Sequence, residues 1–185
     1  MNKIDRKSFA RQISEHLVVA ELGRRGIVAA PFAGNVKKID ILAQAGGKSI
    51  ALQVKGSNHG VWTVNNVVAK DLLDVEQDGE KQILRGKKEI DRGLIFVNVS
   101  IGDTAGEDAY YILTAGDRQD LYHSCYEWML NKHNCVRPRN QDSLESSLGA
   151  EAFEPHRDAW HLVFAALGFS DEETKERCGC VKCKK

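Results

Sequence analysis

Two neighbouring segments decide the fold predicted for this chain: Lys37-Lys38-Ile39-Asp40-Ile41-Leu42-Ala43 and, after Gly46-Gly47, Lys48-Ser49-Ile50-Ala51-Leu52-Gln53-Val54-Lys55. Their apolar runs predict strands at about 38–45 and 48–57, and the Gly-Gly pair is typical of a hairpin turn. Asp40 stands between two isoleucines, where a charged side chain costs stability unless it is paired or bound. Because side chains alternate along a strand, Gln53 and Lys55 are expected on one face.

Polar side chains at the ends of these neighbouring strands predict a site for a divalent metal and a phosphate. Hydrolysis of a phosphodiester needs a positioned water, neutralised charge at phosphorus and a stabilised leaving oxygen, and carboxylate-bound Mg²⁺ can supply all three. Asp40 would anchor Mg²⁺ or Mn²⁺, and Gln53 would add a neutral amide oxygen. Lys55 would orient or deprotonate the water, or offset charge on the phosphate. Each residue alone also fits an ordinary strand or turn, so the prediction rests on their order and spacing.

The helix predicted over 7–26 brings a fourth candidate, Glu15. It shares a helix face with apolar residues such as Val18 and Leu22, and a carboxylate there is costly unless it is paired or holds a metal. Two roles are therefore open. Glu15 either completes the metal site or pairs with Arg11 one turn earlier, which is a common arrangement on helices.

Taken together, Glu15 in a first helix, Asp40 in a second strand and Gln53-Val54-Lys55 in a third resemble the PD-(D/E)XK nuclease superfamily. That superfamily includes restriction endonucleases and archaeal Holliday-junction resolvases. The resemblance covers residues 8–57 well, and it covers 94–113 and the last helix, which contains Trp160, loosely. It implies a restriction-endonuclease-like α/β fold, with a mixed central β-sheet of about four to five strands flanked by α-helices. It also implies that Asp40, Glu15 and Lys55 carry the family's roles, whereas Gln53 stands where the family usually has Asp or Glu.

The order of predicted elements agrees with that fold independently of the resemblance. We expect a single α/β domain over 1–169 and a charged, cysteine-containing, mobile tail over 170–185. The region 66–92 is expected to form a loop and a short helix, with Asp78-Gly79 breaking any helix. The remaining expected elements are strands at 27–32, 61–64, 94–99 and 109–113 and helices at 117–132 and 156–167. The strand at 61–64 is expected to extend the main sheet.

Whole-chain charge gives no support for nucleic-acid binding, because 26 basic residues balance 26 acidic ones. The distribution is uneven, however. Residues 1–60 hold ten Lys or Arg and four Asp or Glu, a local excess of six positive charges. Such a basic segment suits a phosphate-backbone partner, although an uneven solvated surface would look the same. The candidate contacts to DNA are Lys37, Lys38, Ser57 and Asn58.

Five cysteines is an odd number, so reduced thiols are expected. Cys178, Cys180 and Cys183 supply three ligands for a zinc site that needs four, and the fourth would come from His156, His161 or a second chain. A flexible tail with free thiols is the alternative. No apolar run is long enough to span a bilayer, and the first residues lack the apolar core of a signal peptide, so a cytoplasmic location is expected.

The function expected from these features is a Mg²⁺-dependent DNA endonuclease that hydrolyses phosphodiester bonds. The alternative is a catalytically inactive nuclease-fold module that binds DNA or regulates, because Gln53 removes one negative charge from the metal site. A third interpretation makes the cysteine tail a zinc or redox element. A homodimer would suit an enzyme that cuts both strands of DNA.

Overall fold

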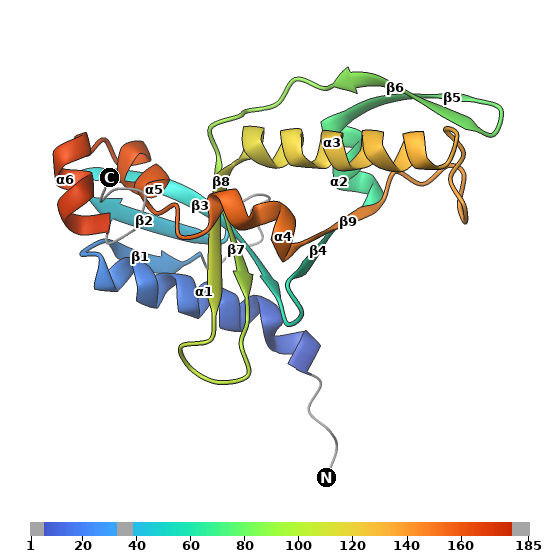
Figure 1. Cartoon of the computed structure of the whole chain (residues 1–185). Coiled ribbons are helices and arrows are strands. Elements are labelled where there is room, and N and C mark those ends of the chain that lie inside the picture. The colour runs from blue at the N-terminus through green and yellow to red at the C-terminus, as the bar shows by residue number, and fades with distance from the viewer. Residues whose placement is uncertain (1–5, 33–38, 179–185) are drawn as a thin grey trace, which may run out of the picture.

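The computed structural model describes residues 6–32 and 39–178. A five-stranded mixed sheet in the order β1-β2-β3-β7-β8 organises the chain (Figure 1). Its strands are β1 (Val28–Pro31), β2 (Ile41–Ala45), β3 (Lys48–Ser57), β7 (Ile95–Ser100) and β8 (Ala109–Thr114). The β3–β7 pair is parallel and the other pairs are antiparallel. The predicted fold class, a mixed central sheet flanked by helices, is confirmed.

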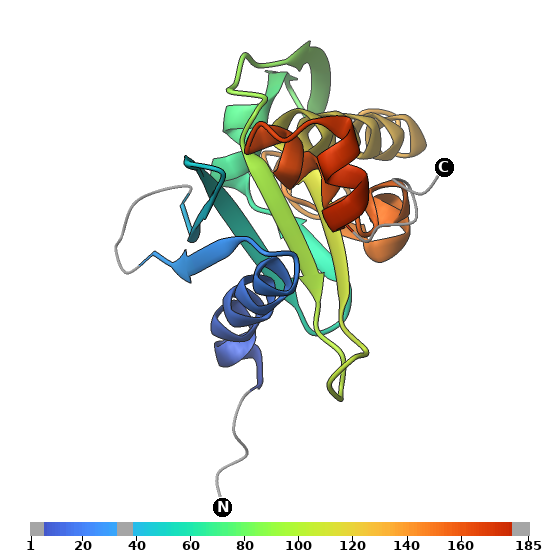
Figure 2. The ribbon, with the colours of Figure 1, turned by 90° about the vertical axis from the view of Figure 1, so that its left-hand side faces the viewer.

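Helices cover both faces of this sheet. The longest are α1 (Arg6–Arg24) and α3 (Ala115–Lys132), and shorter ones are α2 (Asn66–Leu72), α4 (Ala150–Phe153), α5 (His161–Ala166) and α6 (Asp171–Cys178), with a 3₁₀ turn η1 (Glu154–His156). Figure 2 shows α5 and α6 (red) in front of the strands. In Figure 1, α3 lies well away from α1.

Two separate hydrophobic cores form, one on each face of the sheet. The first core joins alternate strand residues such as Leu52, Val54 and Val97 to Val18 and Leu22 of α1 and to α5. We call this side the α1 face. The second core joins the intervening strand residues, among them Phe96, Tyr111 and Leu113, to Tyr122 and Tyr126 of α3. We call this side the α3 face. Strand alternation therefore decides which core each side chain enters.

Several predicted elements differ from the structure. The strand β4 (Val61–Val64) does not extend the main sheet, because it pairs with β9 (Ser146–Gly149) in a two-stranded sheet. The region expected to be a loop contains a hairpin of β5 (Leu73–Asp78) and β6 (Lys81–Lys87). Asp78-Gly79 begins its turn, and Gly79 takes the positive φ that such turns require. The helix predicted from 156 begins only at His161, after η1.

The segment expected to begin a mobile tail forms helix α6. Thr174 and Cys178 are buried, and Cys178 belongs to the core on the α1 face. The Arg25 Nε donates a hydrogen bond to the Cys178 carbonyl oxygen at 3.2 Å. This pattern was hard to see in the sequence because most of α6 is charged and exposed, and two buried residues are enough to hold it.

Candidate active site

The candidate site lies where β2 stops pairing with β3. Their register ends at Ile41 opposite Leu52, while β3 continues beside β7 to Ser57. Beyond that point Asp40 takes the place of β2 as the hydrogen-bond partner of β3. Its backbone N–H donates to the Leu52 carbonyl at 3.0 Å, and its Oδ2 accepts from the Val54 N–H at 2.9 Å. The carboxylate thus satisfies a strand N–H and is held in one place, with only 8% of Asp40 exposed.

One guanidinium joins Asp40 to Glu15. The Arg11 Nε donates to Glu15 Oε1 at 2.8 Å, and its Nη2 donates to Asp40 Oδ1 at 3.2 Å. The ordinary pairing of Glu15 with Arg11 is therefore present, and the same arginine brings Glu15 to Asp40. We call Glu15 and Asp40 the carboxylate pair. Both carboxylates are largely buried, whereas the Arg11 side chain is 73% exposed. The pair raises the pKa of Arg11, chiefly through the Glu15 hydrogen bond.

A close approach between α1 and β3 positions the carboxylate pair. A Cβ at Gly56 would lie 2.5 Å from the Ala10 carbonyl oxygen and 2.6 Å from the Ser14 Oγ, so only glycine allows this contact. Ser14 is fully buried there, and its hydroxyl donates to the Arg11 carbonyl at 2.8 Å. The helix therefore lies directly against the strand segment that carries Lys55.

Gln53 and Lys55 share the α3 face, as strand alternation predicted, because Leu52 and Val54 enter the other core. The Lys55 Nζ lies 3.8 Å from Asp40 Oδ2, with 42% of the side chain exposed. Burial lowers the pKa of Lys55, Asp40 opposes this, and the charges of Arg118 and Arg11 lower it further. The Gln53 side chain makes no hydrogen bond to any residue that the structure describes.

Parallel pairing adds residues that the sequence did not reveal. Phe96 lies beside Gln53, and Asn98 lies beside Lys55. Asn98 is buried, and its Oδ1 has no hydrogen-bond partner within the described chain. From α3, the Arg118 guanidinium lies over the Phe96 ring, 4.9 Å from its centroid. These contacts join segments far apart in the sequence, so no local pattern signals them.

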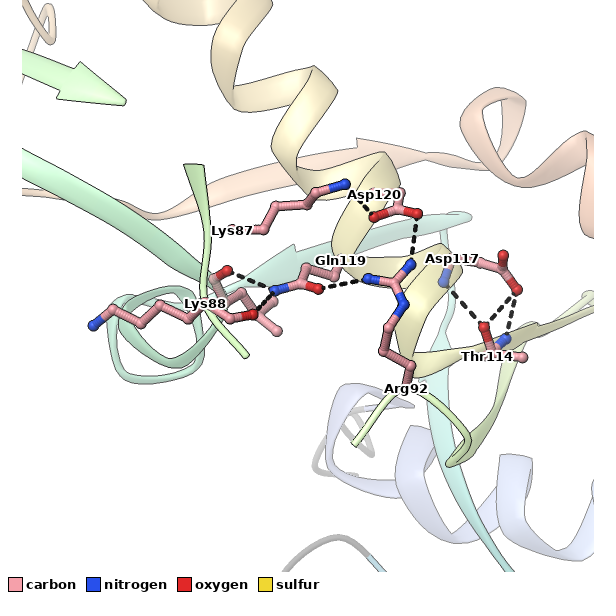
Figure 3. A network of polar contacts seen from close by, with 8 residues as sticks. Lys87, Lys88, Arg92, Thr114, Asp117, Gln119 and Asp120 are labelled. Carbon is pink, nitrogen blue, oxygen red and sulfur yellow. Dashed lines mark hydrogen bonds and ion pairs between the residues drawn. The ribbon is translucent and has the colours of Figure 1, made fainter. Parts of the chain in front are cut away.

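The start of α3 is held by a polar network (Figure 3). Thr114 and Asp117 form a capping box at its N-terminus. Gln119 joins two other segments to α3, because its amide donates to the carbonyls of Leu72 at 2.8 Å and Lys88 at 2.7 Å. Arg92 donates to Gln119 and Asp120, and Lys87 donates to Asp120. Residue 118 therefore lies between two anchored neighbours.

The predicted DNA contacts fall in two places. Ser57 and Asn58 follow Lys55 at the bend into β4, and the Ser57 Oγ accepts the N–H groups of His59 at 3.2 Å and Val61 at 3.0 Å. Ser57 thus shapes the bend, and its contact with DNA stays a prediction. Lys37 and Lys38 lie outside the described residues.

The oxygen ligands at the site suit a hard divalent cation in type, although they are few. Within residues 6–32 and 39–178, no cluster of three or more His, Cys, Asp or Glu side chains is arranged to hold a metal. The carboxylate pair is what the described residues offer a metal at this place, and water would have to complete its coordination. Mg²⁺ commonly binds through one or two carboxylates and keeps several waters, so this set fits that ion.

The zinc hypothesis is only partly covered by the described residues. Cys178 is buried at the end of α6, whereas Cys180 and Cys183 lie outside the described residues. The zinc site stays a prediction.

Comparisons with known proteins add a structural likeness. No protein-family model and no curated protein matches the sequence. The structure is similar to that of a bacterial homing endonuclease, I-Ssp6803I, with a TM-score of 0.45 and 16% identity over 88% of this chain and 98% of that chain. At this level of similarity, function has to be inferred from the geometry of the site. None of the described helices has the length and apolar character needed to cross a membrane.

Proposed function

We propose that the chain is a Mg²⁺-dependent DNA endonuclease of the PD-(D/E)XK type, with Gln in place of the second acidic residue. The observation that carries the proposal is the position of Asp40. Its carboxylate is fixed beside β3 where the pairing with β2 ends, with Glu15 on one side through Arg11 and the Lys55 ammonium 3.8 Å away on the other. Carboxylates and a cation side by side match what phosphodiester hydrolysis requires.

The carboxylate pair and Gln53 would hold the metal, which when bound supplies charge neutralisation at phosphorus and an acidified water. The chain's own residues do the rest. Asp40 is kept in place by the Val54 N–H, so little reorganisation is needed. Burial lowers the pKa of Lys55, so its amine gives up a proton more readily than an exposed lysine does. In its charged form the same group offsets negative charge on the phosphate.

Cleavage of supercoiled plasmid DNA in Mg²⁺ or Mn²⁺ tests this proposal. Asp40→Asn keeps an oxygen for the Val54 N–H, and we expect it to fold and to lose activity by about 100-fold or more. Lys55→Met should lose activity to a similar degree. The same changes at exposed positions of α2, Asp71→Asn and Lys70→Met, serve as matched controls and should cut like the wild type. Equal cleavage by the wild type and both site variants would refute the assignment.

The second candidate function is a nuclease-fold DNA-binding module without activity. Arg11 favours it, because a guanidinium that already neutralises the carboxylate pair leaves less charge for a metal. Under this alternative the wild type binds DNA, and no divalent ion raises its unfolding temperature. The wild type cleaves the plasmid no more than the site variants do.

A further inference from the structure

Arg118 is a partly buried cation without a carboxylate partner. Among the described residues it makes no hydrogen bond or ion pair, and its guanidinium lies against the Phe96 ring. Burial lowers the pKa of Arg118. The neighbouring Arg92 behaves differently, since it donates to Gln119 at 3.0 Å and to Asp120 at 2.8 Å. Placing a cation in a partly buried position costs free energy, and among the described residues only the contact with the Phe96 ring offsets that cost.

The position of Arg118 beside the candidate site suggests a role in binding. Phe96, beneath the guanidinium, is the β7 neighbour of Gln53, and Lys55 lies two residues further along the same face of β3. Two cations therefore share the α3 face beside the candidate site, and among the described residues Lys55 alone of the two has a carboxylate near it.

The helix turn that carries Arg118 is rigidly placed. The capping box fixes Asp117, and hydrogen bonds to the carbonyls of Leu72 and Lys88 fix Gln119 (Figure 3). The side chain therefore starts from a backbone that does not need to reorganise when a ligand binds, which is typical of a binding residue held in advance.

We propose that Arg118 binds a phosphate of the nucleic-acid backbone on the α3 face, next to the phosphate that is attacked beside Asp40 and Lys55. The inference rests on the proposed function, and it adds a contact from the second half of the chain. A guanidinium suits this role because its planar N–H groups bind phosphate oxygens in pairs. The phosphate would supply a counter-charge that none of the described residues gives Arg118.

Binding of a DNA duplex in EDTA, where no cleavage occurs, tests this role over a series of salt concentrations. We expect Arg118→Met to weaken binding by about tenfold. The slope of log affinity against log salt should become shallower by about 0.9, which corresponds to one lost phosphate contact. Arg118→Lys should keep the slope and lose part of the affinity. Arg85→Met, at a hairpin arginine paired with Glu76, is the matched control and should change neither.

Thermal unfolding separates this role from a structural one. Because Arg118→Met removes an unpaired cation and keeps an apolar contact with Phe96, its unfolding temperature should equal or exceed that of the wild type. A lower unfolding temperature together with an unchanged salt slope would make Arg118 structural and overturn the inference. An unchanged slope while Asp40→Asn abolishes cleavage would also overturn it, and would leave the proposed function standing. A wild type that does not bind DNA would refute both.

Discussion

Arg11 contacts both members of the carboxylate pair, so it competes with any metal that binds there. We expect Arg11→Met to lower the Mn²⁺ concentration at which thermal stabilisation is half complete, because Glu15 and Asp40 lose a competing cation. In EDTA the same variant should be less stable than the wild type, since Glu15 loses its counter-ion and Asp40 keeps only Lys55. Arg24→Met, at an exposed arginine of the same helix, is the control. A higher Mn²⁺ requirement in Arg11→Met would contradict the account.

For individual residues, the sequence predicts contacts between side chains that are close along the chain. Asp40 and Lys55 come together because the hairpin places them on neighbouring strands, and strand alternation puts Gln53 on the same face as Lys55. The pairing of Glu15 with Arg11 follows from one helical turn. Arg118 and Asn98 could not be predicted, because they arrive through the parallel β3–β7 pairing and the packing of α3.

Among the elements, the contact between α1 and β3 decides whether the site is assembled. Gly56→Ala would place a Cβ against the Ala10 backbone, which forces the helix away from the strand. We expect the free energy of unfolding to fall by about 1–3 kcal/mol and cleavage to fall with it, because α1 carries Glu15 and Arg11. Urea unfolding and the plasmid assay measure the two effects.

Gly23→Ala is the matched control on the same helix, since a Cβ at Gly23 meets no atom within 4 Å. It should raise stability by up to about 1 kcal/mol, because alanine favours a helix over glycine. If both glycine variants behave alike, the close approach at Gly56 does not assemble the site.

The elements that sequence patterns missed have physical reasons. Asp78-Gly79 signals a break in a helix and a hairpin turn equally well, and the charged strands around it bury few side chains. The strand β4 has the residues of a sheet strand, yet its partner β9 comes from more than eighty residues later. Such pairings depend on the tertiary fold, and a local window does not contain them.

For the whole molecule, α6 completes the core on the α1 face, in a segment that composition alone assigns to a mobile tail. Glu176→Pro should break this helix at an exposed position and lower the free energy of unfolding by about 3 kcal/mol. Glu176→Ala keeps the helix and is the control. Thermal or urea unfolding measures both variants. Equal stability of the two would mean that the segment is a mobile tail and not a packed helix.

The predicted order of helices and strands was enough to obtain the mixed sheet, because each face is covered by segments with clear apolar patterns. The neutral net charge of the chain was uninformative, since the proposed contacts to DNA would be made by a few cations around Asp40.

The central claim is that the carboxylate pair binds a divalent metal beside Lys55. Anomalous scattering from a crystal soaked in Mn²⁺ tests it most directly. We predict a peak bonded to Asp40 and Glu15 at about 2.0–2.4 Å, with Arg11 displaced from between them. A map without a peak at this place, with Arg11 still bridging Glu15 and Asp40, would contradict the account.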